Sequence, residues 1–209
     1  MLIAPVALIV TMYIAFQQLT ARLGFPLGYL VAFGLYWVLW CLALPGAVLG
    51  SRRVIELFRS GDSRLAQLGI RTQALLWWPI VFPLAFAFLP RIANTSVSIL
   101  LASIALGLII GVTEELLWRG VYVTLFHDNV WLNTIYPSIA FGLWHLCPLS
   151  AVPSRYPGGA LSFAVYSIAL GLSYAHYARR TRSILWCTVS HCIHDALGLG
   201  GFVYAGWLV

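Results

Sequence analysis

Two adjacent glutamates, Glu114 and Glu115, follow an apolar run that carries no charge from Ile92 to Thr113. An ionisable side chain at membrane depth costs about 2.5–3.5 kcal/mol on insertion scales, and such residues usually mark functional sites. Two later apolar segments carry imidazoles, at His145 and His191. An acid and two imidazoles are groups that general acid–base catalysis or zinc ligation uses. We therefore expect a functional site to which three segments contribute.

Glu115 shares one ridge of a predicted helix with Gly107, Gly111 and Arg119, because these residues are spaced by four. Glu115 and Arg119 can form an ion pair, and a structural role is the favoured interpretation of these two residues alone. The two glycines form a small-x-x-x-small pair that lets another helix approach closely. Glu114 lies about 100° around the helix from Glu115. It can therefore face a cavity while Arg119 binds Glu115.

The imidazoles lie in two further motifs, Phe141-x-x-x-His145 and His191-x-x-x-Asp195. His191 and Asp195 are one helical turn apart, so the carboxylate can orient the imidazole and set its tautomer. Taken alone, His145 is better interpreted as a hydrogen-bonded core residue. His194 lies on a neighbouring face and is better interpreted as an interface residue.

Two mechanisms fit these groups. In the first, Glu114 and His145 activate a water as general base, and His191 with Asp195 stabilises the oxyanion. Asp195 must then be protonated, or act through His191, to donate a hydrogen bond. In the second, Glu114, His145 and His191 ligate zinc, which acidifies its bound water. No His-Glu-x-x-His motif is present, so no cofactor is firmly predicted and zinc is the alternative.

The segments that position these residues belong to an integral membrane protein. Of 209 residues, 61% are hydrophobic and 9% charged, and the mean hydropathy is +0.90, whereas soluble domains are about 45–50% apolar and about 25% charged. An all-α, polytopic transmembrane bundle is predicted, with seven apolar segments of about 20 residues each. These segments are 2–20, 28–50, 74–90, 97–125, 132–150, 160–178 and 183–207. The third contains Pro79 and Pro83 and is expected to be kinked or re-entrant.

The division of the chain follows the site motifs. We assign 1–96 to N-terminal spans that include an Arg-rich loop at 51–73, and 97–209 to a catalytic helical core. The loop is interpreted equally well as an interfacial amphipathic segment or as a solvated loop. The four cysteines contain no Cys-x-x-Cys pair and are interpreted as core residues.

The charge pattern indicates topology and partners. The net charge is +6 and every basic residue is arginine. The arginines flank apolar segments and form no aromatic-interleaved patch, so we expect membrane lipids and no nucleic acid as partners. Most arginines lie in 51–73 and 179–182, which places these loops and the N-terminus in the cytoplasm.

The three ordered motifs resemble those of the CAAX protease and bacteriocin-processing (CPBP, or Abi) family of intramembrane endopeptidases. They are Glu114-Glu115-x-x-x-Arg119, Phe141-x-x-x-His145 and His191-x-x-x-Asp195. The resemblance covers about 106–198 and implies a multi-helix membrane protease whose cavity opens toward the cytoplasm. The family's last motif more often ends in Asn, so Asp195 keeps an acceptor and removes a neutral donor.

The resemblance also implies roles for individual residues. Glu114 would be the water-activating acid with His145 as its partner, and His191 with Asp195 would form the oxyanion-binding side. The supporting residues would be Glu115, Arg119 and Phe141. The metallo and glutamic mechanisms are both described for this family.

The expected function is therefore intramembrane proteolysis. Eukaryotic members cleave the last three residues from prenylated CAAX proteins, and many bacterial members resemble bacteriocin-immunity proteins. We predict an endopeptidase acting on membrane-associated protein or peptide substrates, including prenylated CAAX-type ones. The alternative is a non-catalytic immunity or scaffold protein of the same fold, and a proton-coupled transporter is less favoured because no inverted repeat is present. Short loops predict the plasma membrane of a prokaryote, with the endoplasmic reticulum membrane as the alternative.

Overall fold

Helices account for every regular element among residues 1–59, 67–154 and 156–199, the residues that this computed structural model describes. Lipid cannot bond to the backbone N–H and C=O groups of an apolar segment, whereas a helix pairs them within the segment. The predicted all-α class is confirmed. Within these described ranges, four helices are long and apolar enough to cross a membrane: Ala4–Leu23, Leu27–Leu57, Ile70–Phe88 and Val97–Leu125.

The N-terminal part contains three long helical stretches. Its elements are α1 (Ala4–Leu23), α2 (Leu27–Leu35), a π-helical segment (Tyr36–Ala43), α3 (Leu44–Leu57), α4 (Ile70–Pro83), a second π-helical segment (Leu84–Phe88) and a 3₁₀ turn (Ile92–Asn94). Gly50 kinks α3, because its φ of 75° lies in the left-handed region that favours glycine. α4 remains helical through Pro79 and Pro83, so the third predicted segment is a helix with two internal prolines.

The C-terminal part carries all three motifs. Its elements are α5 (Val97–Glu115), a π-helical segment (Leu116–Val121), α6 (Tyr122–Leu125), a further π-helical segment (Trp131–Ile135), α7 (Tyr136–Trp144), α8 (Leu146–Ala151), α9 (Gly159–Thr181) and α10 (Leu185–Leu197). The predicted segment 132–150 is thus interrupted at His145, between α7 and α8. Residues 200–207 of the last predicted segment lie outside the described residues. The count of seven spans stays a prediction.

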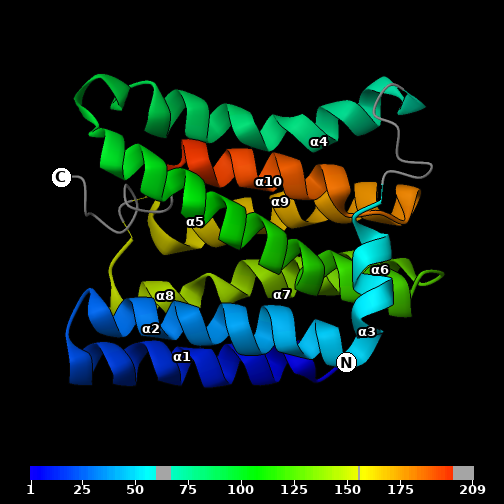
Figure 1. Ribbon diagram of the computed structural model, residues 1–209, viewed down its shortest axis with the longest axis horizontal. Coiled ribbons are helices and arrows are strands. Elements are labelled where there is room, and N and C mark those ends of the chain that lie inside the picture. Colours follow the sequence, from blue (N-terminus) through cyan, green and yellow to red (C-terminus); the bar gives the residue numbers. More distant parts are fainter. Residues whose placement is uncertain (60–66, 155, 200–209) are drawn as a thin grey trace.

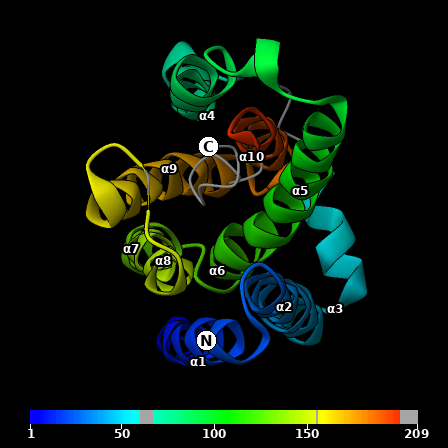
Figure 2. The same ribbon diagram turned by 90° about the vertical axis from the view of Figure 1, so that its left-hand side faces the viewer.

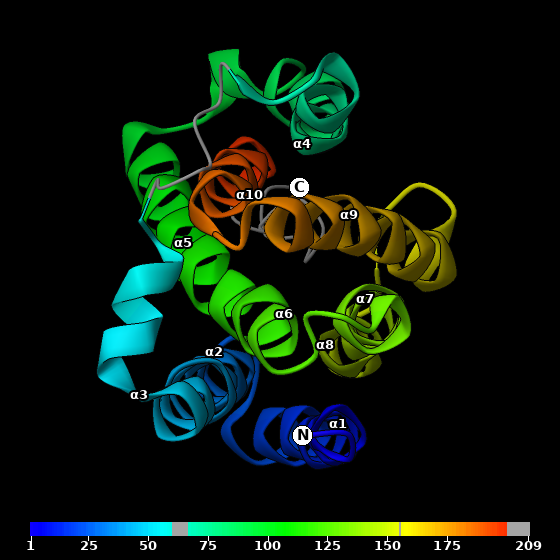
Figure 3. The ribbon, with the colours of Figure 1, turned by 90° about the vertical axis from the view of Figure 1, so that its right-hand side faces the viewer.

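α10 lies inside the bundle, where it contacts α4, α5 and α9 (Figures 2 and 3). Its closest approach is to α5, at the predicted glycine pair. A Cβ atom on Gly107 would lie 2.7 Å from the carbonyl oxygen of Cys192, and one on Gly111 would lie 2.6 Å from the Cys192 Sγ. The expectation that the glycines admit another helix is confirmed, and that helix carries His191.

The connections divide between two ends of the bundle. Figure 1 shows α3 and the α9–α10 connection at one end, with the N-terminus, and the α1–α2 and α8–α9 connections at the other. Both predicted Arg clusters therefore belong to the same end, which agrees with the positive-inside assignment. The segment 51–73 is helical up to Leu57 in α3 and again from Ile70 in α4, with Arg52 exposed and Leu57 buried, and residues 60–66 lie outside the described residues.

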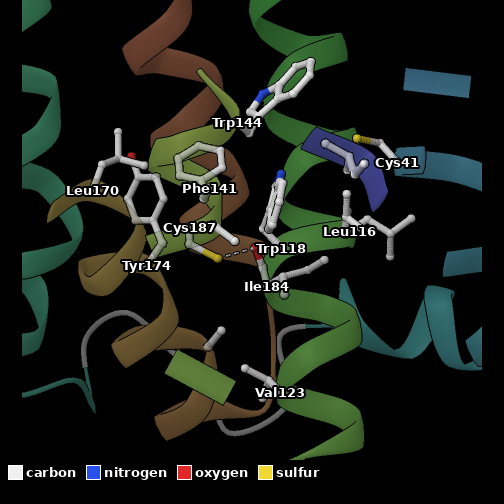
Figure 4. Close-up of a cluster of buried hydrophobic side chains, with 14 of the residues drawn as sticks. Cys41, Leu116, Trp118, Val123, Phe141, Trp144, Leu170, Tyr174, Ile184 and Cys187 are labelled. Carbon is white, nitrogen blue, oxygen red and sulfur yellow. Dashed lines mark hydrogen bonds between the residues drawn. The ribbon is translucent and has the colours of Figure 1, made fainter. Parts of the chain in front are cut away.

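The main hydrophobic core draws on both halves of the chain. Phe16 and Tyr36 from the N-terminal part share it with Trp118 and Trp144. The Tyr36 and Trp144 rings stack with centroids 3.7 Å apart. Figure 4 shows Cys41 and Cys187 among the core side chains, and none of the four cysteines forms a disulfide. The predicted boundary at 96/97 coincides with the start of α5, and the division into two parts stays a prediction.

Candidate active site

Glu115 is the centre of a buried hydrogen-bond network. Its Oε1 accepts hydrogen bonds from Nη1 of Arg119 and Nδ1 of His191, both at 2.8 Å. Glu115 is 0% and Arg119 1% exposed, and the guanidinium lies 4.4 Å from the ring centroid of Phe141, a cation–π distance. The predicted ion pair is confirmed, and it links α5 and the following π-helical turn to α7 and α10.

The Glu115 contact determines the orientation of His191. A carboxylate only accepts hydrogen bonds, so Nδ1 of His191 carries a proton and Nε2 faces the cavity. The one-turn spacing predicted that Asp195 would orient this ring. Asp195 Oδ2 is 3.5 Å from Nε2, so the closer carboxylate is that of Glu115 on the neighbouring helix.

Glu114 faces the opposite side of the His191 ring. Its Oε2 lies 3.9 Å from Nε2 of His191 and is buried without a hydrogen-bond partner. Oδ2 of Asp195 is also buried and unpartnered. Two carboxyl oxygens from different helices therefore surround one imidazole nitrogen. As predicted, Glu114 lines the cavity while Arg119 binds Glu115.

His145 lines the same cavity from the break between α7 and α8. Its Nδ1 is 2.7 Å from the carbonyl oxygen of Phe141, which places a proton on Nδ1 and leaves Nε2 available. Among the described residues, no hydrogen bond joins His145 to Glu114. Glu114 and His145, which were predicted to act together, therefore both line the cavity without a direct bond between them. The imidazole beside Glu114 is that of His191.

Three further polar residues at the site were not predicted as functional. His194, interpreted from sequence as an interface residue, lines the cavity and contacts Asp195 at 2.9 Å and the Tyr166 hydroxyl at 3.1 Å. The hydroxyl of Tyr36 accepts from the Trp118 indole at 2.9 Å and is also a hydrogen-bond neighbour of Glu114. Tyrosines are frequent in this chain, so a single one in an apolar segment gives no signal of such a role.

The cavity has a volume of about 150 Å³. Polar groups gather on one side, and much of the remaining wall is aromatic: Tyr29, Phe33, Trp37, Trp144, Phe163 and Tyr166. An apolar cavity with a few convergent polar groups is the usual form of a small-ligand or substrate site. It can accept an apolar group beside a water and a peptide carbonyl.

The potential metal ligands that cluster in the structure differ from the trio that the sequence predicted for zinc. Within the described ranges, the clustered potential ligands are His191, His194 and Asp195, whose atoms lie within 4.8 Å of one another. Both nitrogens of His194 already have partners, and only Nε2 of His191 is available. The predicted trio with Glu114 and His145 is not gathered as such a cluster. We derive no step through a metal, and the zinc hypothesis stays a prediction.

The three motifs fall within a segment that matches a known family. The family model for type II CAAX prenyl endopeptidase Rce1-like proteins matches residues 96–197, from the N-cap of α5 to the last residue of α10. No curated protein and no solved structure gave a significant match. The matched segment contains Glu114, His145, His191 and Asp195. The match confirms the motif resemblance to the CAAX protease family, and over residues 96–197 the chain is similar to Rce1-like type II CAAX prenyl endopeptidases.

Proposed function

We propose that this chain hydrolyses a peptide bond near the C-terminus of prenylated, CAAX-type membrane-associated proteins, using a water activated by Glu114. The observation that carries the proposal is the unpartnered Oε2 of Glu114, which is buried at the cavity opposite His191. A carboxylate oxygen without a hydrogen-bond partner at a cavity is available to bind a water and accept its proton.

The reaction begins when Glu114 takes a proton from the water and the water oxygen bonds to the scissile carbonyl carbon. The carbonyl π electrons move to oxygen, and His191 stabilises this oxyanion through Nε2–H. Glu115 supports that role, because its carboxylate accepts from Nδ1 and stabilises the imidazolium. Glu114 then gives its proton to the leaving nitrogen as the C–N bond breaks. His145 directs its available Nε2 to the same water.

The cavity supports an apolar substrate. Its aromatic rings offer a surface on which an isoprenoid chain is favourably buried, at about 25 cal/mol per Å² of apolar area. The polar groups lie together, so a chain bound on the rings brings the peptide next to it toward Glu114. A prenylated peptide is thus expected to be cleaved better than the same peptide without the lipid.

Cleavage of quenched peptides, prenylated and unprenylated, by detergent-purified protein tests the proposal. We expect Glu114→Gln to lower the rate by about 10²-fold or more, since the amide cannot accept the proton. Glu56→Gln is the matched control, because Glu56 pairs with Arg52 and Arg53 on α3, away from the cavity. Full activity of Glu114→Gln would end the proposal.

A zinc chelator separates the two mechanisms. Cleavage that depends on Glu114 and survives the chelator supports the glutamic mechanism, whereas loss with the chelator and recovery with zinc supports a metal mechanism. The non-catalytic immunity or scaffold function predicts instead that a cellular phenotype survives substitution of His145 or His191.

A further inference from the structure

We propose that His194, oriented by Tyr166, is a positioning residue that shares a proton with Asp195 and cancels its charge beside the reacting carbonyl. The inference rests on the proposed peptidase function and adds two residues to it. It explains how this chain uses an acid at position 195. A chain of hydrogen bonds runs from α4 inward to Asp195.

The first hydrogen bond is accepted by the carbonyl of Pro79, which has no partner within its own helix. The carbonyl of Pro79 would normally accept from the backbone N–H four residues later, but that residue is Pro83, which has no N–H. The next N–H, that of Leu84, bonds to Ile80 and Val81. The hydroxyl of Tyr166 on α9 lies 2.8 Å from the Pro79 oxygen. Because a carbonyl only accepts, the single hydroxyl proton of Tyr166 lies in this bond.

The second bond fixes the tautomer of His194. Its Nε2 is 3.1 Å from the same Tyr166 oxygen. The hydroxyl proton is already directed at Pro79, so the oxygen accepts here and Nε2 of His194 carries a proton. Pro79 and Pro83 on α4 therefore determine that the protonated nitrogen of His194 on α10 is Nε2.

The third hydrogen bond, between His194 and Asp195, contains one further proton. Nδ1 of His194 is 2.9 Å from Oδ1 of Asp195. Either Asp195 is protonated and donates to Nδ1, or Nδ1 is also protonated and donates to the carboxylate. Both arrangements place one proton in this contact, and both make the His194–Asp195 pair neutral. A neutral pair has the net charge of an asparagine.

This neutrality matters because of the groups that surround Asp195. Its Oδ2 lies 3.5 Å from His191 Nε2, and Oε2 of Glu114 lies 3.9 Å from the same nitrogen. Arg119 is committed to Glu115, and His145 is the remaining imidazole at the cavity. An ionised, uncompensated Asp195 would repel the oxyanion that forms beside His191. His194 removes that repulsion.

A double-substitution cycle on cleavage rate tests the charge role. We expect His194→Ala to lower the rate by about tenfold or more, a smaller effect than the roughly 10²–10³-fold cost of losing an oxyanion donor outright. In the Asp195→Asn background the same substitution should cost about threefold or less, because no charge then needs compensation. Equal losses in both backgrounds would show that His194 only packs, and an inactive Asp195→Asn protein would also overturn the proposal.

Tyr166→Phe tests the outer part of the chain. The phenyl ring keeps the packing but removes the acceptor of the Nε2 proton, so we expect a partial loss that shrinks in the Asp195→Asn background. Tyr13→Phe is the matched control, because Tyr13 is exposed on α1. A Tyr166→Phe loss of the same size in both backgrounds would contradict a role through Asp195.

A measurement on the wild-type protein requires no cleavage, and it uses a variant only to assign signals. Nitrogen-15 NMR of histidine-labelled protein, with the His194 signals assigned by their loss in His194→Gln, reports which ring nitrogens carry protons. We expect a protonated Nε2. A neutral ring with the proton on Nδ1 and a bare Nε2 would refute the proposal. If the wild type cleaves no peptide while Nε2 is protonated, the peptidase function fails and the hydrogen-bond chain remains.

Discussion

Gly107→Ala is expected to slow cleavage by moving α10 away from α5. The added Cβ would lie 2.7 Å from the Cys192 carbonyl oxygen and 2.8 Å from the Ala196 nitrogen, both backbone atoms that cannot rotate away. Ordinary contact begins at 3.4 Å, so the helices must separate locally by about 0.7 Å. His191 is the residue before Cys192 and moves with it.

The displacement is large compared with the tolerance of the site. It would lengthen the 2.8 Å bond between Glu115 and His191 toward about 3.5 Å, at which a hydrogen bond is largely lost. A misplacement of about 1 Å can cost about 100-fold in rate, so we expect Gly107→Ala to lower cleavage by about 10- to 100-fold. Overpacking of this kind costs about 1–3 kcal/mol of stability, which a melting curve in detergent measures.

Gly34→Ala provides the matched control. Its Cβ would meet nothing within 4 Å, and alanine favours a helix by about 0.5–1 kcal/mol. Its activity should therefore equal that of the wild type, with unchanged or slightly higher stability. If Gly107→Ala cleaves peptide as fast as Gly34→Ala, the close approach of α5 and α10 does not position His191.

Two further substitutions test the groups around the glutamates. Arg119→Lys keeps the charge but loses the planar guanidinium that bonds to Glu115 through Nη1 and covers the Phe141 ring, so we expect at least about a tenfold loss of cleavage; wild-type activity would show that the charge alone suffices. Tyr36→Phe leaves the buried indole N–H of Trp118 without its acceptor, at about 1–3 kcal/mol; an unchanged melting temperature in detergent would contradict that bond.

Helical spacing predicted the contacts that form within one segment. Glu115 and Arg119 pair as their i,i+4 spacing requires, and the glycines on the same ridge face another helix. Glu114 lines the cavity while Glu115 binds Arg119, and this difference also follows from their angular separation on the helix. These relations depend on one helix only, so the sequence contains all the information needed.

The contacts between segments could not be obtained in this way. Spacing favoured Asp195 as the residue that orients His191, whereas the structure places Glu115 closer, because the glycine ridge brings α5 against α10. The role of His194 depends on Tyr166, which lies 28 residues earlier in the chain. No periodicity relates residues on different helices, so such pairs emerge only from the packed bundle.

The catalytic groups and part of the aromatic wall of the cavity come from different parts of the chain. All the groups assigned to catalysis lie within the matched segment 96–197. Three of the aromatic wall residues, Tyr29, Phe33 and Trp37, come from α2 and the π-helical segment that follows, outside the match. Substitutions on this wall change the apolar surface without touching the Glu115–His191 network. We therefore expect the N-terminal helices to determine which lipid chain is accepted, while α5, α7 and α10 determine that a peptide bond is cleaved.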